Sequence, residues 1–138
     1  MKIRRLLSIL FIACTVLFAG CSSFTFDITQ SGSSTEVRIN NAEDGKEAET
    51  NWFSVGKNRK AVIASSLDQG KVEIEFVSAE VIAHMDAEDE VIPGDVVESV
   101  SIGTLGTIEV SIPAGNYIMR IRTVGKTSGS FTVKFEKE

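Results

Sequence analysis

The sequence predicts an all-β fold, an antiparallel β-sandwich of about seven to nine short strands with Greek-key-like connections. Three observations lead to this fold class. From Thr35 onward apolar residues recur at every second position, as in Val72, Ile74 and Phe76. Turn-forming residues such as Gly, Pro and Asn separate these runs at intervals of about ten residues. No stretch has the apolar period of a long amphipathic helix.

The first twenty residues differ from the rest of the chain. Lys2, Arg4 and Arg5 form a short positive segment, and no charged residue occurs from Leu6 to Gly20. This apolar run is shorter than the roughly 20 residues of a membrane-spanning helix. Its length and its positive flank are typical of a secretory signal peptide.

The run closes with Leu17-Phe18-Ala19-Gly20-Cys21. This pattern resembles a bacterial lipobox, although the family favours Leu where Phe18 stands. The resemblance implies cleavage between Gly20 and Cys21, with a diacylglycerol thioether on Cys21. Two acyl chains are sufficient for stable anchoring in a membrane. The alternatives are an ordinary secretory signal with an incidental cysteine, or an uncleaved N-terminal anchor.

The domain organisation follows from this cleavage. We expect a signal peptide over residues 1–20, a lipidated N-terminus with a Ser/Gly-rich spacer over 21–34, and a β-sandwich over 35–138. Alternating Phe24, Phe26 and Ile28 leave open a first strand within the expected spacer.

Maturation would also change the charge and thiol content of the chain. The full sequence has a net charge of −5, and loss of three basic residues leaves 11 Lys and Arg against 19 Asp and Glu, a net −8. Such a domain lacks the positive surface that nucleic acid binding requires. Cys14 would be removed and Cys21 lipidated, so no thiol would remain for a disulfide or a metal.

The predicted strands follow in order along the chain. Gly70 is expected to form a hairpin turn between the strands before and after it, and Gly125 to Gly129 to close the last hairpin. Val77 to Gly94 is expected as a long acidic connection with one helical turn around Val81 to Met85. The strands themselves are expected over residues 35–40, 53–55, 61–64, 72–76, 95–102, 108–112, 117–122 and 131–136.

Tyr117, the only tyrosine, follows Gly115-Asn116 at the start of a strand. This arrangement resembles a tyrosine corner, in which the phenol bonds back to the backbone. The segments from Ile112 to Tyr117 and from Gly129 to Val133 resemble the final hairpins of pre-peptidase C-terminal-type sandwiches. Those are extracellular accessory modules, so the resemblance implies the architecture more than a function.

Three groups of residues are candidates for chemistry or binding. His84, the only histidine, could be a catalytic base, but no serine has a nucleophile motif around it, and a solvated loop histidine fits better. Asp86, Glu88, Asp89 and Glu90 could hold calcium, although their spacing is not that of an EF-hand, and solvated charge is the simpler interpretation.

Trp52 is the third candidate. If Phe53 faces the core, Trp52 faces outward, where its indole could stack on a sugar or a peptide. Packing beneath a loop is the alternative, because large aromatic side chains are usually buried. Lys57, Arg59 and Lys60 follow closely and could form a small basic patch.

Together these features predict a lipid-anchored, extracytoplasmic protein of the cell envelope. The lipobox resemblance also implies a location: the plasma membrane, or the outer membrane in a cell that has one, because in that family the residue after the cysteine directs sorting and here it is Ser22 rather than Asp. The domain would be a non-catalytic module that binds an unknown envelope protein or glycan, with no cofactor besides the lipid. The alternatives are a small hydrolase that uses His84, and an assembly or chaperone-like factor that binds by strand addition.

Overall fold

The structure is a computed structural model that describes residues 12–14 and 24–138. These residues form an all-β fold with antiparallel pairing throughout, which confirms the predicted fold class. None of them belongs to a helix long and apolar enough to cross a membrane. The strands are β1 (Ile12–Cys14), β2 (Thr25–Ser31), β3 (Ser34–Ala42), β4 (Glu47–Glu49), β5 (Phe53–Val55), β6 (Arg59–Ile82), β7 (Glu90–Ile102), β8 (Leu105–Ile112) and β9 (Gly115–Lys137).

Two long strands, β6 and β9, form the centre of a single sheet. They pair with each other from Arg59 opposite Lys137 to Ser78 opposite Tyr117. The sheet continues in the order β1-β2-β3-β9-β6-β7, and three further strands pair with the central two: β4 and β5 with β9, and β8 with β6. Each central strand therefore has different neighbours along its two halves.

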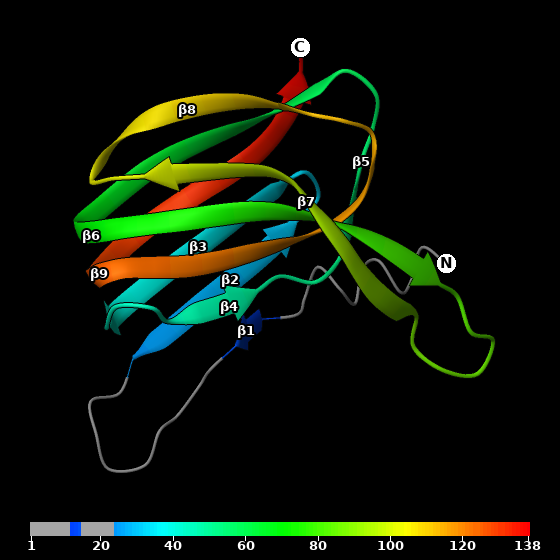
Figure 1. The fold of residues 1–138 in the computed structure, drawn as a ribbon, viewed down its shortest axis with the longest axis horizontal. Coiled ribbons are helices and arrows are strands. Elements are labelled where there is room, and N and C mark those ends of the chain that lie inside the picture. Colours follow the sequence, from blue (N-terminus) through cyan, green and yellow to red (C-terminus); the bar gives the residue numbers. More distant parts are fainter. Residues whose placement is uncertain (1–11, 15–23) are drawn as a thin grey trace.

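Both central strands bend near their midpoints, so that the sheet folds back on itself (Figure 1, left side). The β6–β9 register shifts between Leu67 and Lys71. Gly70 (φ 84°) and Gly125 (φ 73°) have positive φ values, which glycine adopts without a steric penalty. The two halves of the sheet then face each other as two layers, in the manner of a sandwich.

These bends correct two of the predicted hairpins. Gly70 does not end a strand but lies within β6, and Gly125 and Gly129 lie within β9. A glycine with positive φ is needed both in a tight turn and in a bulge, so the local sequence signal is the same for both. Only the long-range partner, here the other central strand, distinguishes them.

The core lies between the two layers. In β6 the inward-facing Val72, Ile74 and Phe76 are fully buried, as the alternating sequence predicts. From the paired strand β9, Met119 and Ile121 are equally buried. One continuous cluster of apolar residues from both halves of the sheet fills the interior.

The β-domain begins earlier than Thr35. Phe24, Phe26 and Ile28 are buried in the core, and β2 pairs with β3 along its whole length. Much of the segment expected as a spacer is therefore strand β2. Its alternating apolar residues point into the core of the domain. The Ser/Gly signal corresponds to the tight β2–β3 turn, where Gly32 has a φ of 59°.

The expected acidic connection over Val77 to Gly94 is mostly strand. β6 runs on to Ile82 and pairs with the start of β7, for example Val81 with Val91, to form a two-stranded arm that extends to the lower right in Figure 1. Only residues 83–89 form its loop, and no helical turn occurs there. The register shifts between Phe76 and Ala79 interrupt the alternation, which hid the strand from the sequence pattern.

The tyrosine corner predicted at Tyr117 is present. Its hydroxyl donates a hydrogen bond of 2.7 Å to the carbonyl oxygen of Pro113. The ring is buried and lies 6.2 Å from that of Phe53. Burial raises the pKa of the phenol, and the arrangement gives Tyr117 a structural role.

The predicted signal peptide and the lipobox, with Gly20 and Cys21, lie outside the described residues. The exception is β1, whose three residues belong to the predicted signal peptide. In the structure β1 pairs with β2, with Ile12 opposite Thr29 and Cys14 opposite Phe26.

Candidate functional site

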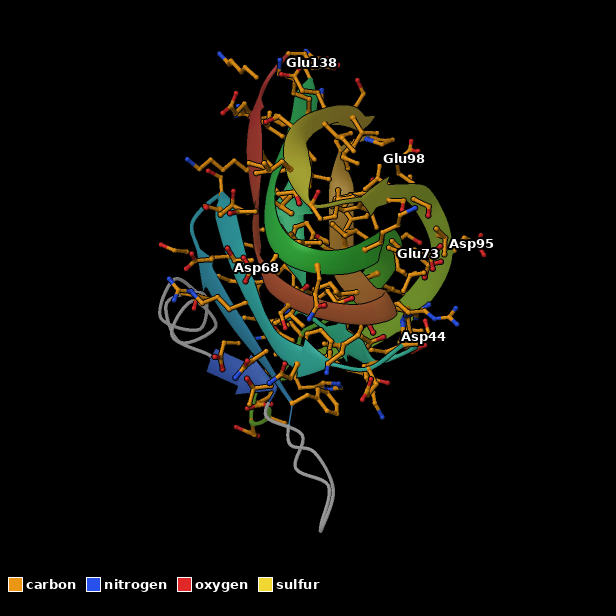
Figure 2. The ribbon with its side chains drawn as sticks, turned by 90° about the vertical axis from the view of Figure 1, so that its left-hand side faces the viewer. Asp44, Asp68, Glu73, Asp95, Glu98 and Glu138 are labelled. Atoms are coloured by element: carbon orange, nitrogen blue, oxygen red, sulfur yellow. The ribbon has the colours of Figure 1, made fainter. Side chains whose placement is uncertain are left out.

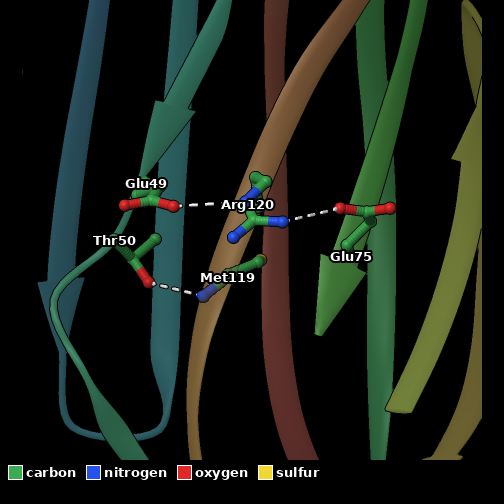
Figure 3. A network of polar contacts seen from close by, with 5 residues as sticks. All are labelled: Glu49, Thr50, Glu75, Met119 and Arg120. Carbon is green, nitrogen blue, oxygen red and sulfur yellow. Dashed lines mark hydrogen bonds and ion pairs between the residues drawn. The ribbon is translucent and has the colours of Figure 1, made fainter. Parts of the chain in front are cut away.

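A charged network lies across β4, β9 and β6 (Figure 3). Arg120 donates from Nε to Glu49, at 3.2 Å, and from Nη1 to Glu75, at 3.5 Å. The hydrogen bond that Arg120 donates to Glu49 is the main reason that the pKa of Arg120 is raised. All three side chains are at least one-third exposed, so each pair contributes less than about 1 kcal/mol to stability.

Thr50 fastens the end of β4 to the central strand beside this network. Its N–H donates to the carbonyl oxygen of Met119 at 2.9 Å, and the N–H of Met119 donates to Thr50 Oγ1 at 3.0 Å. Both residues are buried. We interpret the network as structural, because its carboxylates are already paired with Arg120.

A shallow pocket of about 280 Å³ lies near the β2–β3 turn and the loop before β6. Its apolar part includes the rings of Phe53 and Phe135, whose centroids are 5.3 Å apart. Arg59 contributes a guanidinium to the lining. The residues that line it are Gln30, Gly32, Ser33, Thr35, Phe53, Ser54, Val55, Gly56, Arg59 and Phe135.

Gln30 holds one wall of this pocket in place. Its side-chain amide donates to the carbonyl oxygen of Asn51 at 3.2 Å and accepts from the N–H of Asn51 at 3.0 Å. This two-bond clamp ties the end of β2 to the chain that leads into β5. Phe53 is then set by pairing with Tyr117 across β5 and β9.

The lining determines what this pocket could bind. Phe53 and Phe135 offer an aromatic surface, and Arg59 offers a donor for an acceptor oxygen or a carboxylate. The described residues that line the pocket include no His, Cys, Asp or Glu. Its chemistry therefore suits recognition of a small apolar group that carries an acceptor, rather than proton transfer.

Sequence reasoning predicted this region only in part. Trp52 lies in the chain between β4 and β5 and is half-buried. Its exposure is intermediate between the two predicted states, an outward-facing indole and a side chain packed beneath a loop. Within the predicted basic patch, Lys60 pairs with Glu109 at 3.0 Å, whereas Arg59 reaches the pocket. Gln30 was missed because its partner, Asn51, is 21 residues away and no local pattern marks it.

The structure places His84 and the acidic residues at the tip of the β6–β7 arm. His84 Nε2 lies 3.2 Å from Glu90 Oε1, and both side chains are about half exposed. Asp86 and Glu88 are exposed, and Asp89 is half-buried. His84 is not among the described residues that line the pocket beside Phe53 and Arg59, so its surroundings do not favour the hydrolase alternative.

The calcium hypothesis finds no support in this geometry. Within residues 12–14 and 24–138, no three His, Cys, Asp or Glu side chains are close enough to hold a metal ion. The carboxylates of the arm are adjacent in sequence, but Asp86, Glu88, Asp89 and Glu90 do not converge on one point.

The arm also carries most of the exposed apolar side chains among the described residues. Met85, at the tip, is 97% exposed. The two strands also carry Ile82, Ile92, Val96 and Val97, each between 37% and 45% exposed. Apolar side chains gathered on a projecting element indicate an interaction surface more than an isolated apolar residue does.

No protein-family model matches the chain. No curated protein matches it either. Two solved structures resemble it weakly. The Drosophila melanogaster CENP-C cupin domain is 9% identical, with a TM-score of 0.32 over 87% of this chain and 74% of that one. Drosophila melanogaster CENP-C bound to CAL1 is 9% identical, with a TM-score of 0.29 over 88% and 80%. Similarity at this level carries no argument about fold or function.

Proposed function

We propose that the protein is a lipid-anchored component of the cell envelope, and that its β-domain is a non-catalytic binding module. The observation that carries this proposal is the uncharged run from Leu6 to Gly20, which ends in the lipobox-like Ala19-Gly20-Cys21. The lipid on Cys21 would supply the membrane attachment.

The geometry of the domain supports binding over catalysis. The pocket beside Phe53 and Arg59 has recognition groups, and none of the described residues that line it is a His, Cys, Asp or Glu. The arm presents exposed apolar side chains, among them Met85 at its tip. An envelope protein or a glycan could be recognised by these surfaces, and the membrane would be reached through the lipid.

Metabolic labelling with palmitate tests the anchor. We expect the wild-type protein and Cys14→Ala to incorporate label and to sediment with membranes, because only Cys21 follows the small residues of the lipobox. Cys21→Ala should lose the label. Label that survives in Cys21→Ala, or that is lost in Cys14→Ala, would refute the proposed anchor.

One observation favours a second candidate function, binding by strand addition. Among residues 12–14 and 24–138, the strand that pairs with the outer side of β2 is the three-residue β1, which the proposed cleavage would remove. The backbone N–H and C=O groups of β2 could then pair with an extended segment of a partner.

Photo-crosslinking in cells tests this alternative. A photoreactive residue at the exposed Thr29 of β2 should cross-link to a partner, whereas one at the exposed Lys134 of the inner strand β9 should not. Equal adducts at both positions, or adducts at neither, would reject strand addition while leaving the lipid anchor unaffected.

A further inference from the structure

The bends of β6 and β9 lie together with two connecting segments along the left side of Figure 1, and Figure 2 looks onto them. We call this surface the crease end, and it consists of residues 41–46, 67–71, 103–106 and 123–128.

Hydrogen bonds hold the crease end together. Gly45 donates its N–H to the carbonyl oxygen of Thr123 at 2.9 Å, which joins the β3–β4 loop to the bend of β9. Leu67 donates to the carbonyl oxygen of Thr104 at 2.9 Å, which joins the bend of β6 to the β7–β8 turn. Backbone bonds between segments far apart in sequence make this end a rigid surface.

The first residue of the described domain lies at the same end. Phe24 is buried, and the ammonium of Lys46 lies 5.2 Å from the centroid of its ring. Thr25 pairs with Asn40 directly before the β3–β4 loop. The chain therefore enters the fold at the crease end.

Resting on the proposed lipid anchor, we infer that the crease end lies against the bilayer, and that the pocket and the arm face away from it. Cys21 precedes Phe24 by three residues, which span at most about 11 Å when fully extended. The headgroup layer on each side of the hydrocarbon core is itself about 5–8 Å thick. A tether this short brings the crease end to the lipid headgroups.

The side chains of the crease end suit contact with lipid. Leu105 is 83% exposed and Val124 is 39% exposed, and such apolar side chains can enter the interfacial region. The charges of the crease end balance, whereas the mature chain carries a net −8. The three basic and three acidic residues are Lys46, Lys71, Lys126, Glu43, Asp44 and Asp68.

The remaining surfaces suit the opposite orientation. The arm tip carries Asp86, Glu88, Asp89 and Glu90, which anionic headgroups would repel. The pocket lies near the β2–β3 turn, at the end of β2 away from Phe24. With the crease end on the membrane, both binding surfaces remain accessible to a partner.

Fluorescence quenching in vesicles tests this orientation. Once Cys21 carries lipid, a newly introduced cysteine is the only free thiol of the mature protein, so it can be labelled selectively. We would label Leu105→Cys and Val124→Cys at the crease end, with Ala114→Cys in the β8–β9 turn and Met85→Cys at the arm tip as matched controls. Each lipidated variant is placed in phosphatidylcholine vesicles that contain a lipid with a nitroxide on its headgroup.

The crease-end labels should be quenched several-fold more strongly than the two controls. Insertion of eight Gly and Ser residues between Ser23 and Phe24 should weaken this quenching several-fold, because the longer tether releases the domain from the surface. Equal quenching at all four positions, or stronger quenching at Ala114→Cys or Met85→Cys, would overturn the orientation.

Flotation of the same vesicles separates the two levels of the inference. Protein that floats with the lipid but shows equal quenching leaves the anchor in place and refutes the orientation. Protein that does not float, and whose membrane association in cells does not depend on Cys21, refutes both the anchor and the orientation.

Discussion

At the scale of single residues, a few polar side chains fix the positions of strands that apolar packing alone would leave loose. The side chains of Tyr117, Thr50 and Gln30 each form a hydrogen bond with backbone atoms. The partner of Tyr117 lies in the same turn, whereas the partners of Thr50 and Gln30 lie in distant parts of the chain. Tyr117 could be predicted, because its partner lies four residues away in a turn with a recognisable sequence. Thr50 and Gln30 could not, since their partners are 69 and 21 residues distant.

The corner at Tyr117 allows a direct measurement. Tyr117→Phe keeps the ring beside Phe53 but removes the hydroxyl that bonds to Pro113. We expect a loss of about 1 kcal/mol in the free energy of unfolding, measured by urea denaturation. Thr107→Val, which removes an exposed hydroxyl from β8, should change it by less than about 0.5 kcal/mol. Equal stability of Tyr117→Phe and the wild type would show that the corner is dispensable.

At the scale of elements, the strands were easier to predict than their connections. The alternation of Val72, Ile74 and Phe76 correctly identified a half-buried strand. The same pattern could not show that this strand continues through Gly70 into the one before it, because a bend and a hairpin share their local signals. The arm was missed for a similar reason, since its register shifts disturb the alternation.

Gly129 should be a sensitive position of the bend. Its φ is 127°, and a Cβ atom there would lie 2.5 Å from Leu67 Cα and 2.7 Å from Asp68 N, both backbone atoms that cannot move aside. Gly129→Ala should therefore destabilise the domain by more than Gly32→Ala, which faces open space and costs about 1–2 kcal/mol through its φ alone.

Thermal denaturation of the two variants gives this comparison directly. A lower midpoint for Gly129→Ala than for Gly32→Ala is expected, because only the former adds a backbone collision to the strain in φ. Similar midpoints would mean that β6 and β9 can separate at the bend without much loss of stability.

At the scale of the whole molecule, the proposed maturation would change the sheet as well as attach the protein to a membrane. Cleavage after Gly20 would remove Ile12–Cys14 and make β2 the edge strand. The charged side chain of Asp27 is exposed on this strand, and such residues protect open edges from unwanted pairing. The candidate site was less predictable than the fold, because Arg59, Gln30 and Phe135 meet only through this topology.

Hydrogen exchange can detect this change of edge. The measurement compares the uncleaved and the mature protein, both in detergent. The backbone amides of β2 that bond to β1 in the uncleaved chain should exchange faster in the mature protein. The expected increase is about fivefold for each lost hydrogen bond of about 1 kcal/mol. Amides of β3 serve as the internal control, because β2 and β9 flank this strand in both forms. Unchanged exchange in β2 would mean that β1 contributes nothing to the sheet, and that cleavage opens no new site for strand addition. Faster exchange confined to β2 would identify a sheet edge that exists only after maturation. This edge would begin close to the lipidated Cys21.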